Sequence, residues 1–462
     1  MTARAIARSS ARTSWLRYRR SLGLWLMLIV APVGARFMIS GEDGHGVMIA
    51  IDDHLPVLTW PVIGVWLGIV VSTLLIPIAY AYLRANTTRR QPWQVEEVTA
   101  ASRIAIALGR FAADAGVLLL VLAALTLAGW VLAALLVPGG VDPLRLALAL
   151  WMVAAPTLIG IAAIRTFFDA VPVLRRWPGD LLFIILWFAS IAMPAAIEGR
   201  ASTFATNIVD FEGYYRPIVA GSATKTDNFA IGSTDLKPGR VTLDVMAGLS
   251  APGYAQARAA WVGIAVALVV LAGLLYRPHR PARHGRVRAW LGRAFAVGPP
   301  KSANPAAAPA HRIALPPLGL IVAEMRLIGA GRGFKLLALA AGLLGLLGDF
   351  RHIGSPAGLL LLVFALSSQA GRSEARGLLA LTRTAPLSPM LRRAAFLLAG
   401  TMWAVLLSVP AAIAHRSADL LLLGLETGAA ATSIAMLLGA LTGSAFAPRI
   451  VLLIIWYGYL SS

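Results

Sequence analysis

Long runs of apolar residues dominate the chain, and short arginine-rich polar segments separate them. A helix needs about 20 predominantly apolar residues to cross the hydrocarbon core of a bilayer. Of the 462 residues, 58% are hydrophobic and only 13% are charged, which leaves too little polar surface for a soluble protein of this length. The sequence therefore predicts an all-α polytopic membrane protein. We place eleven spans at residues 22–39, 57–83, 111–137, 144–165, 180–197, 259–276, 334–349, 356–371, 394–414, 419–445 and 449–461.

The basic residues lie in every second polar segment. They precede the first predicted span and follow the second, fourth, sixth, eighth and tenth spans. Because basic residues collect in cytoplasmic loops, we expect a cytoplasmic N-terminus, and the odd span count then places Ser462 outside the inner (plasma) membrane. The net charge of +20 has this same explanation. No basic and aromatic surface stands apart from the spans, so we expect no nucleic acid partner.

The residue types exclude several kinds of chemistry. The chain has no cysteine, so disulfides, thiolate metal sites and a cysteine nucleophile are excluded. Histidine is sparse and no H-E-x-x-H spacing occurs, so we expect no metal site. Residues 1–20 lead into the first apolar run without a small-residue cleavage site, which predicts an uncleaved N-terminus.

Two segments depart from the alternation of spans and short loops. Residues 198–258 form the only long outside loop, and its run GRVTLDV suggests a strand. We expect this loop to form an ordered cap, the alternative being a loose connector. Residues 277–312 are basic and rich in Pro and Ala, which is typical of a tether. The chain is thus predicted to consist of two membrane halves, 1–276 and 313–462, joined by the cytoplasmic linker 277–312.

Two charged loops share one plan. RRQPWQVEEVTAASRIAIALGR runs over residues 89–110, and SEARGLLALTRTAPLSPMLRR runs over residues 373–393. Each starts with a short helix-prone segment that has glutamate in its early turns, where the positive helix end favours an anion. Each then breaks before a serine, Ser102 or Ser388, that is suited to cap the next helix. The two halves also start alike, because SWLRYRRSLGLW and LGLIVAEMRLIGAGRGFK both predict helices at the inner membrane interface.

With these interfacial helices and paired loops, the chain resembles the permease subunits of type-two ATP-binding-cassette (ABC) exporters. The resemblance implies a transport subunit with no enzyme activity of its own. It implies partner ABC ATPase subunits that bind ATP, while this chain binds no cofactor and has no G-x-x-x-x-G-K-[ST] motif. It further implies that the loops contact the ATPases through Trp93, Glu96, Glu97, Glu374 and Arg376. The chain departs from the family in having five predicted spans in its second half where six are usual, and in the length of its outside loop.

Other interpretations of the same residues stay open. The loop charges either contact an ATPase or only keep the loops out of lipid. Glu426, inside the tenth span, either faces a transport pathway or pairs with a neighbouring helix. Asp114 lies four residues after Arg110, which favours a local ion pair.

Two functions compete with the exporter interpretation. One is an ion-coupled secondary transporter, although the spans contain no matched pair of acidic residues. The other is a membrane enzyme acting on lipid-linked substrates, for which the outside acids and His54 are candidates: Asp52, Asp53, Asp210 and Glu212. The sequence does not identify the transported substrate.

Overall fold

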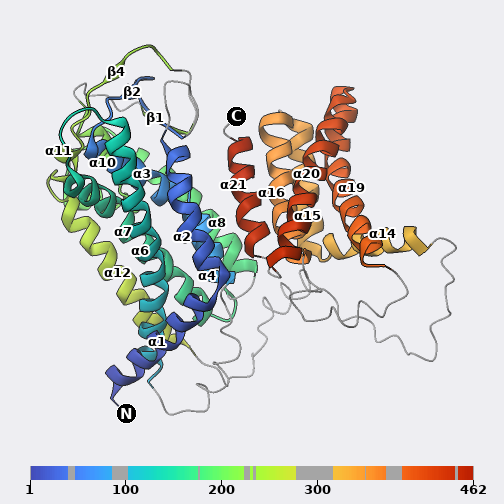
Figure 1. The fold of residues 1–462 in the computed structure, drawn as a ribbon, viewed down its shortest axis with the longest axis horizontal. Coiled ribbons are helices and arrows are strands. Elements are labelled where there is room, and N and C mark those ends of the chain that lie inside the picture. The colour runs from blue at the N-terminus through green and yellow to red at the C-terminus, as the bar shows by residue number, and fades with distance from the viewer. Residues whose placement is uncertain are drawn as a thin grey trace. The chain divides into compact units, whose positions relative to one another are not determined.

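The computed structural model describes ten stretches of the chain, namely residues 2–39, 47–85, 102–174, 177–222, 229–232, 236–276, 316–348, 350–370, 388–442 and 446–460. These stretches form two compact units, Met1–His279 and Arg280–Ser462 (Figure 1). The division lies at the start of the predicted linker 277–312, whose residues are outside the described ones. We call the two bodies unit 1 and unit 2.

Unit 1 is mainly helical, and its elements follow one another along the chain as α1 (Ala3–Arg20), α2 (Leu22–Ala35), η1 (Arg36–Met38), β1 (Met48–Ile51), β2 (Leu55–Pro56), α3 (Trp60–Thr73), α4 (Ile76–Ala85), α6 (Arg103–Leu136), α7 (Pro143–Ala170), α8 (Trp177–Ala192), η2 (Met193–Ile197), α9 (Phe204–Asn207), α10 (Tyr215–Val219), β3 (Phe229–Gly232), β4 (Arg240–Val241), α11 (Val245–Leu249) and α12 (Tyr254–Leu275). Unit 2 contains α14 (Pro316–Ile328), α15 (Arg332–Leu347), the π-helical turn η3 (Phe350–Gly354), α16 (Ser355–Gln369), α19 (Pro389–His415), α20 (Asp419–Thr442) and α21 (Phe446–Leu460).

Many of these helices have the length and composition of membrane spans. Among the described residues five single helices qualify, namely α6, α7, α12, α19 and α20, and the total rises to eight if each of three bent helix pairs counts as one span. The chain is therefore an α-helical, membrane-embedded protein. Each of the eleven intervals predicted from the sequence contains a helix, but several of these helices are short, so eleven spans remain a prediction.

The first helix crosses the end of the unit 1 bundle. The chain axis turns by 67° between α1 and α2. Ser21 lies at this corner, where its hydroxyl oxygen accepts a hydrogen bond from the Leu24 N–H at 3.4 Å and so caps α2. α1 packs against the first turns of α6, and a side chain at Gly109 of α6 would lie 2.8 Å from the Cβ of Ser10. The close approach of these two helices thus depends on a glycine.

Small residues also let α3 and α7 approach each other. A Cβ added at Gly64 or Gly68 of α3 would collide with α7, at the Leu146 backbone and at the Val153 side chain respectively. Small residues four apart commonly allow two membrane helices to pack closely. Trp66 and Leu67, on the same helix, are fully buried. This contact forms the centre of the unit 1 core.

The described part of the long outside loop folds into a cap together with the first outside loop. β1 pairs with β3 in antiparallel register, with Ile49 opposite Ile231, and β2 pairs with β4 in parallel. Figure 1 shows these strands at the end of unit 1 opposite to α1. The predicted strand GRVTLDV is confirmed in part, because Arg240–Val241 forms β4 and Leu243 pairs with Ser222 in an isolated bridge, while the Asp244 carboxylate caps the short helix α11. We call residues 198–253 with β1 and β2 the cap.

Unit 2 has its own core. Leu362 and Leu366 of α16, Ala399 of α19 and Ala435 of α20 are fully buried and belong to one cluster. α14 lies against α19, where the Trp403 indole N–H donates to the Met325 carbonyl oxygen at 2.9 Å. Between α14 and α15 the axis turns by 87°, so α14 runs across the end of this helix bundle.

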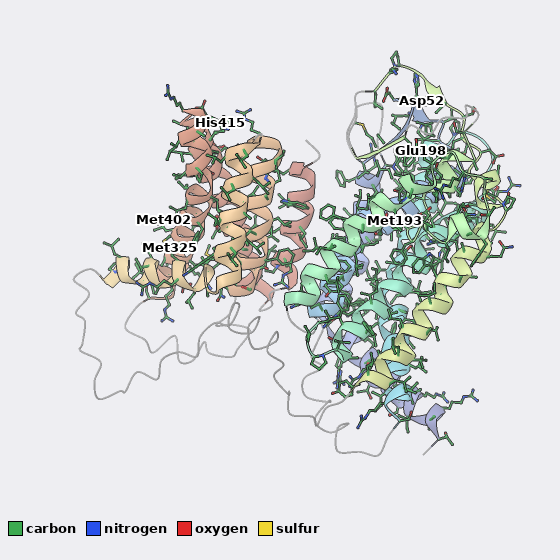
Figure 2. The ribbon with its side chains drawn as sticks, turned by 180° about the vertical axis from the view of Figure 1, so that it is seen from behind. Asp52, Met193, Glu198, Met325, Met402 and His415 are labelled. Carbon is green, nitrogen blue, oxygen red and sulfur yellow. The ribbon has the colours of Figure 1, made fainter. Side chains whose placement is uncertain are left out.

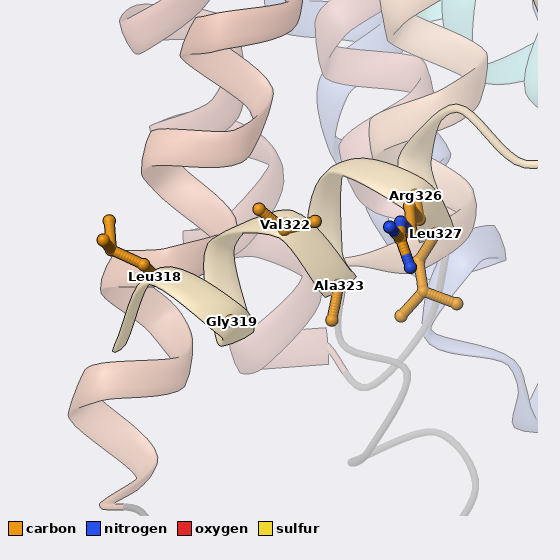
Figure 3. Close-up of a pocket in the computed structure, with 6 residues that line it drawn as sticks. All are labelled: Leu318, Gly319, Val322, Ala323, Arg326 and Leu327. Carbon is orange, nitrogen blue, oxygen red and sulfur yellow. The ribbon is translucent and has the colours of Figure 1, made fainter. Parts of the chain in front are cut away.

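The outward face of α14 forms a shallow open groove of about 690 Å³ (Figure 3). Leu318 and Val322 are about half exposed in it, and Arg326 lies at one end. This partly apolar, partly basic face agrees with the predicted helix at the membrane interface.

Candidate functional site

The five residues predicted to contact an ATPase lie outside the described residues. Trp93, Glu96 and Glu97 fall in 86–101, and Glu374 and Arg376 fall in 371–387. The residues that end each loop are described, and both serine caps are confirmed. Ser102 Oγ accepts from the Ala105 N–H at 3.4 Å at the start of α6, and Ser388 Oγ accepts from the Leu391 N–H at 3.2 Å at the start of α19.

The acid predicted inside the tenth span is on the surface of its unit. Glu426 lies in α20, and its side chain is exposed in unit 2. Within unit 2 itself, therefore, it is not part of a buried polar cluster. Its role in a transport pathway stays a prediction.

The outside acids of the first loop form a turn. Asp52 and Asp53 have positive φ angles of 50° and 68°, and the Ile51 and His54 backbones exchange hydrogen bonds of 2.9 Å across them. Figure 2 places Asp52 at the tip of the cap. Asp53 accepts a hydrogen bond from Lys237 Nζ at 2.8 Å, and this contact raises the pKa of Lys237. The turn thus links the two loops of the cap.

The other two outside acids belong to a polar cluster where the cap meets α7, α8 and α12. We use the name Arg258 network for the hydrogen-bonded polar residues of this cluster, all of them buried except the half-buried Ser190: Thr157, Ser190, Asn207, Asp210, Glu212, Arg216, Tyr254 and Arg258. The predicted outside loop 198–258 ends at Arg258. The structure places it in the second turn of α12, with only 3% of its surface exposed.

Arg258 connects α12 to α7. Its Nε donates to the Met152 carbonyl oxygen at 3.1 Å, and its Nη2 donates to Thr157 Oγ1 at 2.9 Å and to the Val153 carbonyl at 2.6 Å. Pro156 explains why the Met152 oxygen is free to accept. A proline has no N–H, so the carbonyl of Met152, four residues earlier, has no helical donor. The guanidinium provides the missing donor in the middle of α7.

The same guanidinium holds the cap. Its Nη1 donates to the Phe211 carbonyl oxygen at 2.7 Å and to the Asp210 carbonyl oxygen at 3.3 Å. Gly213 lies against it with a φ of 76°, and a Cβ there would be 2.6 Å from Arg258 Cζ. The ring of Phe211 lies over Gly160 of α7 and edge-on to Trp261, with ring centroids 4.8 Å apart. Residues 210–213 are therefore held against α7 and α12.

Asp210 gives this segment its shape. Its two carboxylate oxygens accept from the backbone N–H groups of Gly213 at 2.7 Å and Tyr215 at 2.9 Å. Burial raises the pKa of Asp210, whereas the positive charge of Arg258 and these backbone donors oppose the rise. Since the geometry uses both oxygens as acceptors, we assign Asp210 as an ionised carboxylate that balances Arg258.

Glu212 is different, because burial raises its pKa well above the usual value. Its side chain is fully buried, and its Oε2 has no hydrogen-bond partner. Ser190 Oγ lies 2.7 Å from Glu212 Oε1 and 2.8 Å from the Trp187 carbonyl oxygen. A hydrogen bond that Ser190 donates to Glu212 stabilises the ionised carboxylate and opposes the rise, so burial is what favours the neutral acid.

Asn207 and Arg216 extend the network through the cap. Arg216 Nε donates to Asn207 Oδ1 at 2.8 Å, and Asn207 Nδ2 donates to the Pro252 carbonyl at 3.1 Å. The sequence indicated Asp210 and Glu212 as candidates but not these partners. The one available signal was Arg258 itself, a lone arginine at the border of an apolar run.

Comparison of the chain with protein-family models, with curated proteins and with solved structures finds no match in any of the three. What the chain does must therefore be argued from its own residues. Chemically, the Arg258 network can hold the cap on the middle of α7 and the start of α12, and burial of Glu212 favours its protonated form.

Proposed function

We propose that this chain is the permease subunit of an ABC exporter of the plasma membrane, and that partner ATPase chains bind and hydrolyse the ATP. The observation that carries the proposal is a shared helix order in the two units. In each unit a helix lies across the end of the bundle, turns sharply into an apolar helix, and packs on the helix that follows a charged loop. Two such units in one chain would provide the two halves of a permease.

Element by element, the correspondence is as follows. α1 and α2 both pack on α6, and α14 and α15 both pack on α19. α6 packs on α7 in unit 1, and α19 packs on α20 in unit 2. In unit 1, α4 precedes the charged loop and contacts α8. In unit 2, α16 precedes the charged loop and contacts α21. This agreement supports a structural repeat, although the two halves share little sequence.

The charged loops are the proposed contact with the ATPases. Each leads to a serine-capped helix, α6 or α19, on which the cross-lying helix of that unit packs. A movement of either loop would therefore be transmitted to two helices, namely the serine-capped helix and the helix that packs on it. We assign Trp93 as an apolar anchor, because aromatic side chains commonly dominate an interface. We assign four further loop residues as charged contacts with the ATPases, namely Glu96, Glu97, Glu374 and Arg376.

The experiment is copurification of the ATPase with the full chain in detergent. We expect Trp93→Ala, Glu96→Lys with Glu97→Lys, and Glu374→Lys each to weaken ATPase binding roughly thirtyfold, since anchor residues commonly contribute about 2 kcal/mol. Glu198→Lys is the matched control, because this acid is exposed and lies at the start of the cap (Figure 2). If all the loop variants retain full ATPase binding and transport, the loops are solvated connectors and the exporter proposal fails.

The orientation is proposed from the arginine distribution. Tags at residues 90, 300 and 380 should be inaccessible from outside intact cells, and a tag near residue 230 should be accessible. This places the N-terminus in the cytoplasm and the cap outside. Labelling of residue 300 from outside would refute the arrangement of two halves around a cytoplasmic linker.

The second candidate, an ion-coupled transporter, gains support from Glu212. A buried acid whose pKa is raised by its surroundings is the kind of group that a proton-coupled carrier uses. This function predicts that transport by the chain alone acidifies or alkalises the lumen of a vesicle, and that Glu212→Gln abolishes the pH change. An exporter would instead require ATP and the partner ATPase for any transport.

A further inference from the structure

α1 is the most basic element of the described structure. It contains no acidic residue and six arginines, at positions 4, 8, 12, 17, 19 and 20. Arg4, Arg8 and Arg12 follow one another at intervals of four, and Arg19 follows Arg12 after two further turns. Residues with these spacings share one helix face. All four side chains are exposed, so α1 presents a continuous basic face.

The rest of the unit fixes the direction of this face. The opposite side of α1 is anchored on α6, where Ser10 Oγ donates to the Ile106 carbonyl at 3.2 Å. Tyr18 Oη donates to Asp114 Oδ1 at 2.6 Å, and both side chains are buried. With these residues facing inward, the arginines point away from the bundle.

The position of α1 relative to the bilayer follows from its neighbours. α6 has 34 residues and is about 51 Å long at 1.5 Å per residue, whereas the hydrocarbon core is about 30 Å thick. α6 therefore extends beyond the hydrocarbon. α1 packs on its first turns and is bent by 67° from the apolar α2, so α1 runs along the membrane surface.

Two tryptophans mark the level of the lipid headgroups. Trp15 of α1 is 36% exposed, and Trp25 in the second turn of α2 is 52% exposed. The Trp25 indole N–H donates to the Arg19 carbonyl oxygen at 3.0 Å, which joins the two helices at the bend. Exposed tryptophans of this kind are enriched where hydrocarbon meets headgroups. The basic face of α1 thus lies at the height of the lipid phosphates.

We propose that the Arg4, Arg8, Arg12 and Arg19 face of α1 binds the phosphodiester headgroups of anionic phospholipids in the adjoining leaflet. Charge complementarity carries the assignment, because four guanidinium groups face a layer of phosphates with no carboxylate on the same helix. The short, four-residue spacing suits two or more separate headgroups rather than one. The inference does not depend on the exporter proposal, since any function in a membrane leaves α1 at this surface.

The test uses the full chain in a neutral detergent, titrated with brominated phosphatidylglycerol or brominated phosphatidylcholine. Bromine quenches nearby tryptophan, and the difference between wild type and Trp15→Phe isolates the signal of Trp15. We expect tighter binding of phosphatidylglycerol than of phosphatidylcholine. Each arginine near a phosphate is worth about fivefold in affinity, so Arg8→Gln with Arg12→Gln should weaken phosphatidylglycerol binding roughly twenty-fivefold. Added salt should also weaken the binding of phosphatidylglycerol to the wild type, because it screens the charges.

The matched control removes the same charge at the other end of unit 1, through Arg145→Gln with Arg200→Gln, both exposed. It should leave the lipid affinity unchanged, and an unchanged thermal midpoint should show that each variant is folded. Equal affinity of wild type for the two lipids would overturn the proposal, as would an equal loss in the control. If the α1 variant keeps its lipid affinity but loses copurifying ATPase, the basic face binds protein, and the lipid proposal is wrong.

Discussion

Arg258 Nε donates to the Met152 carbonyl oxygen at 3.1 Å, across the gap between α12 and α7. This oxygen lacks a helical donor because Pro156 carries no N–H. The proline and the arginine therefore form a complementary pair, although about 100 residues separate them in the sequence. One guanidinium provides the donor that α7 lacks at Pro156 and also holds the cap through Phe211. The interior of α7 and the cap are thus stabilised by the same side chain.

Arg258→Met should strongly destabilise unit 1. The substitution leaves the carbonyl oxygens of Met152, Val153 and Phe211 buried without these donors, and removes the positive charge beside Asp210. Breaking a buried charged network by removing one partner costs about 3–5 kcal/mol. Arg258→Lys keeps the charge but cannot reach all of these oxygens, so its loss should be intermediate. Thermal unfolding in detergent measures both, and an unchanged midpoint for Arg258→Met would contradict the role of the network.

Gly213→Ala should cost more than Gly199→Ala, although both glycines have similar positive φ angles of 76° and 68°. An L-residue in this region costs about 1 kcal/mol in either position. At Gly213 the new Cβ would also lie 2.6 Å from Arg258 Cζ, whereas at Gly199 it meets open space. We expect a loss of roughly 3 kcal/mol at Gly213, measured by the same unfolding experiment. Equal losses would show that backbone strain alone matters.

Features that depend only on residues close together in the sequence could be predicted from it. The apolar runs predicted helices, and the serines before α6 and α19 predicted their caps, because a cap is recognised within four residues. Features that join distant segments were missed. Nothing in the local pattern indicated that Ile49 would pair with Ile231, since the register of two distant strands depends on the whole fold.

Asp114 shows the same limit. Its spacing from Arg110 predicted a local pair, and the structure adds a hydrogen bond from Tyr18, 96 residues earlier, which the spacing did not indicate. The tertiary contact between α1 and α6 supplies a donor that a single helix cannot provide. The coupling residues Trp93 and Glu374 lie outside the described residues, so the structure does not test them.

The stability of the chain should depend on pH through Glu212. Burial raises the folded pKa of this acid well above 4.5, with the nearby negative charge of Asp210 acting in the same direction and Ser190 and Arg258 opposing it. The folded chain therefore binds the proton more tightly than the unfolded chain. The stabilisation is complete below about 4.5 and is lost as the pH rises through the folded pKa.

Glu212→Gln removes this dependence, because the amide stays neutral and has a similar shape. Relative to the variant, the wild-type thermal midpoint should fall as the pH rises. All other titrating groups are common to the two proteins, so the difference between their midpoints isolates Glu212. A difference that stays constant with pH would mean that Glu212 keeps the same protonation state in the folded and unfolded chains.

The hydrogen bond between Tyr18 and Asp114 should couple α1 to α6. The 2.6 Å distance between the two buried oxygens is typical of a hydroxyl donating to a carboxylate, which contributes about 1.5–3 kcal/mol. Tyr18→Phe, Asp114→Asn and the double variant form a cycle in which other contacts of each residue cancel. Unfolding free energies should give a coupling of at least about 1 kcal/mol. Additive effects of the two substitutions would show that α1 is anchored by packing alone.

Ser102→Ala and Ser388→Ala should loosen the first turns of α6 and α19 to a similar extent. Each hydroxyl accepts from the N–H three residues later, and the loss of such a cap costs about 1 kcal/mol. Hydrogen exchange should therefore accelerate about fivefold at the Ala105 and Leu391 amides, while amides in the helix centres are unaffected. Ser9→Ala, at an exposed position inside α1, is the control and should leave both amides unchanged. Faster exchange at only one of the two amides would mean that the serines do not play equivalent parts, and the proposed repeat of the two charged loops would lose this support.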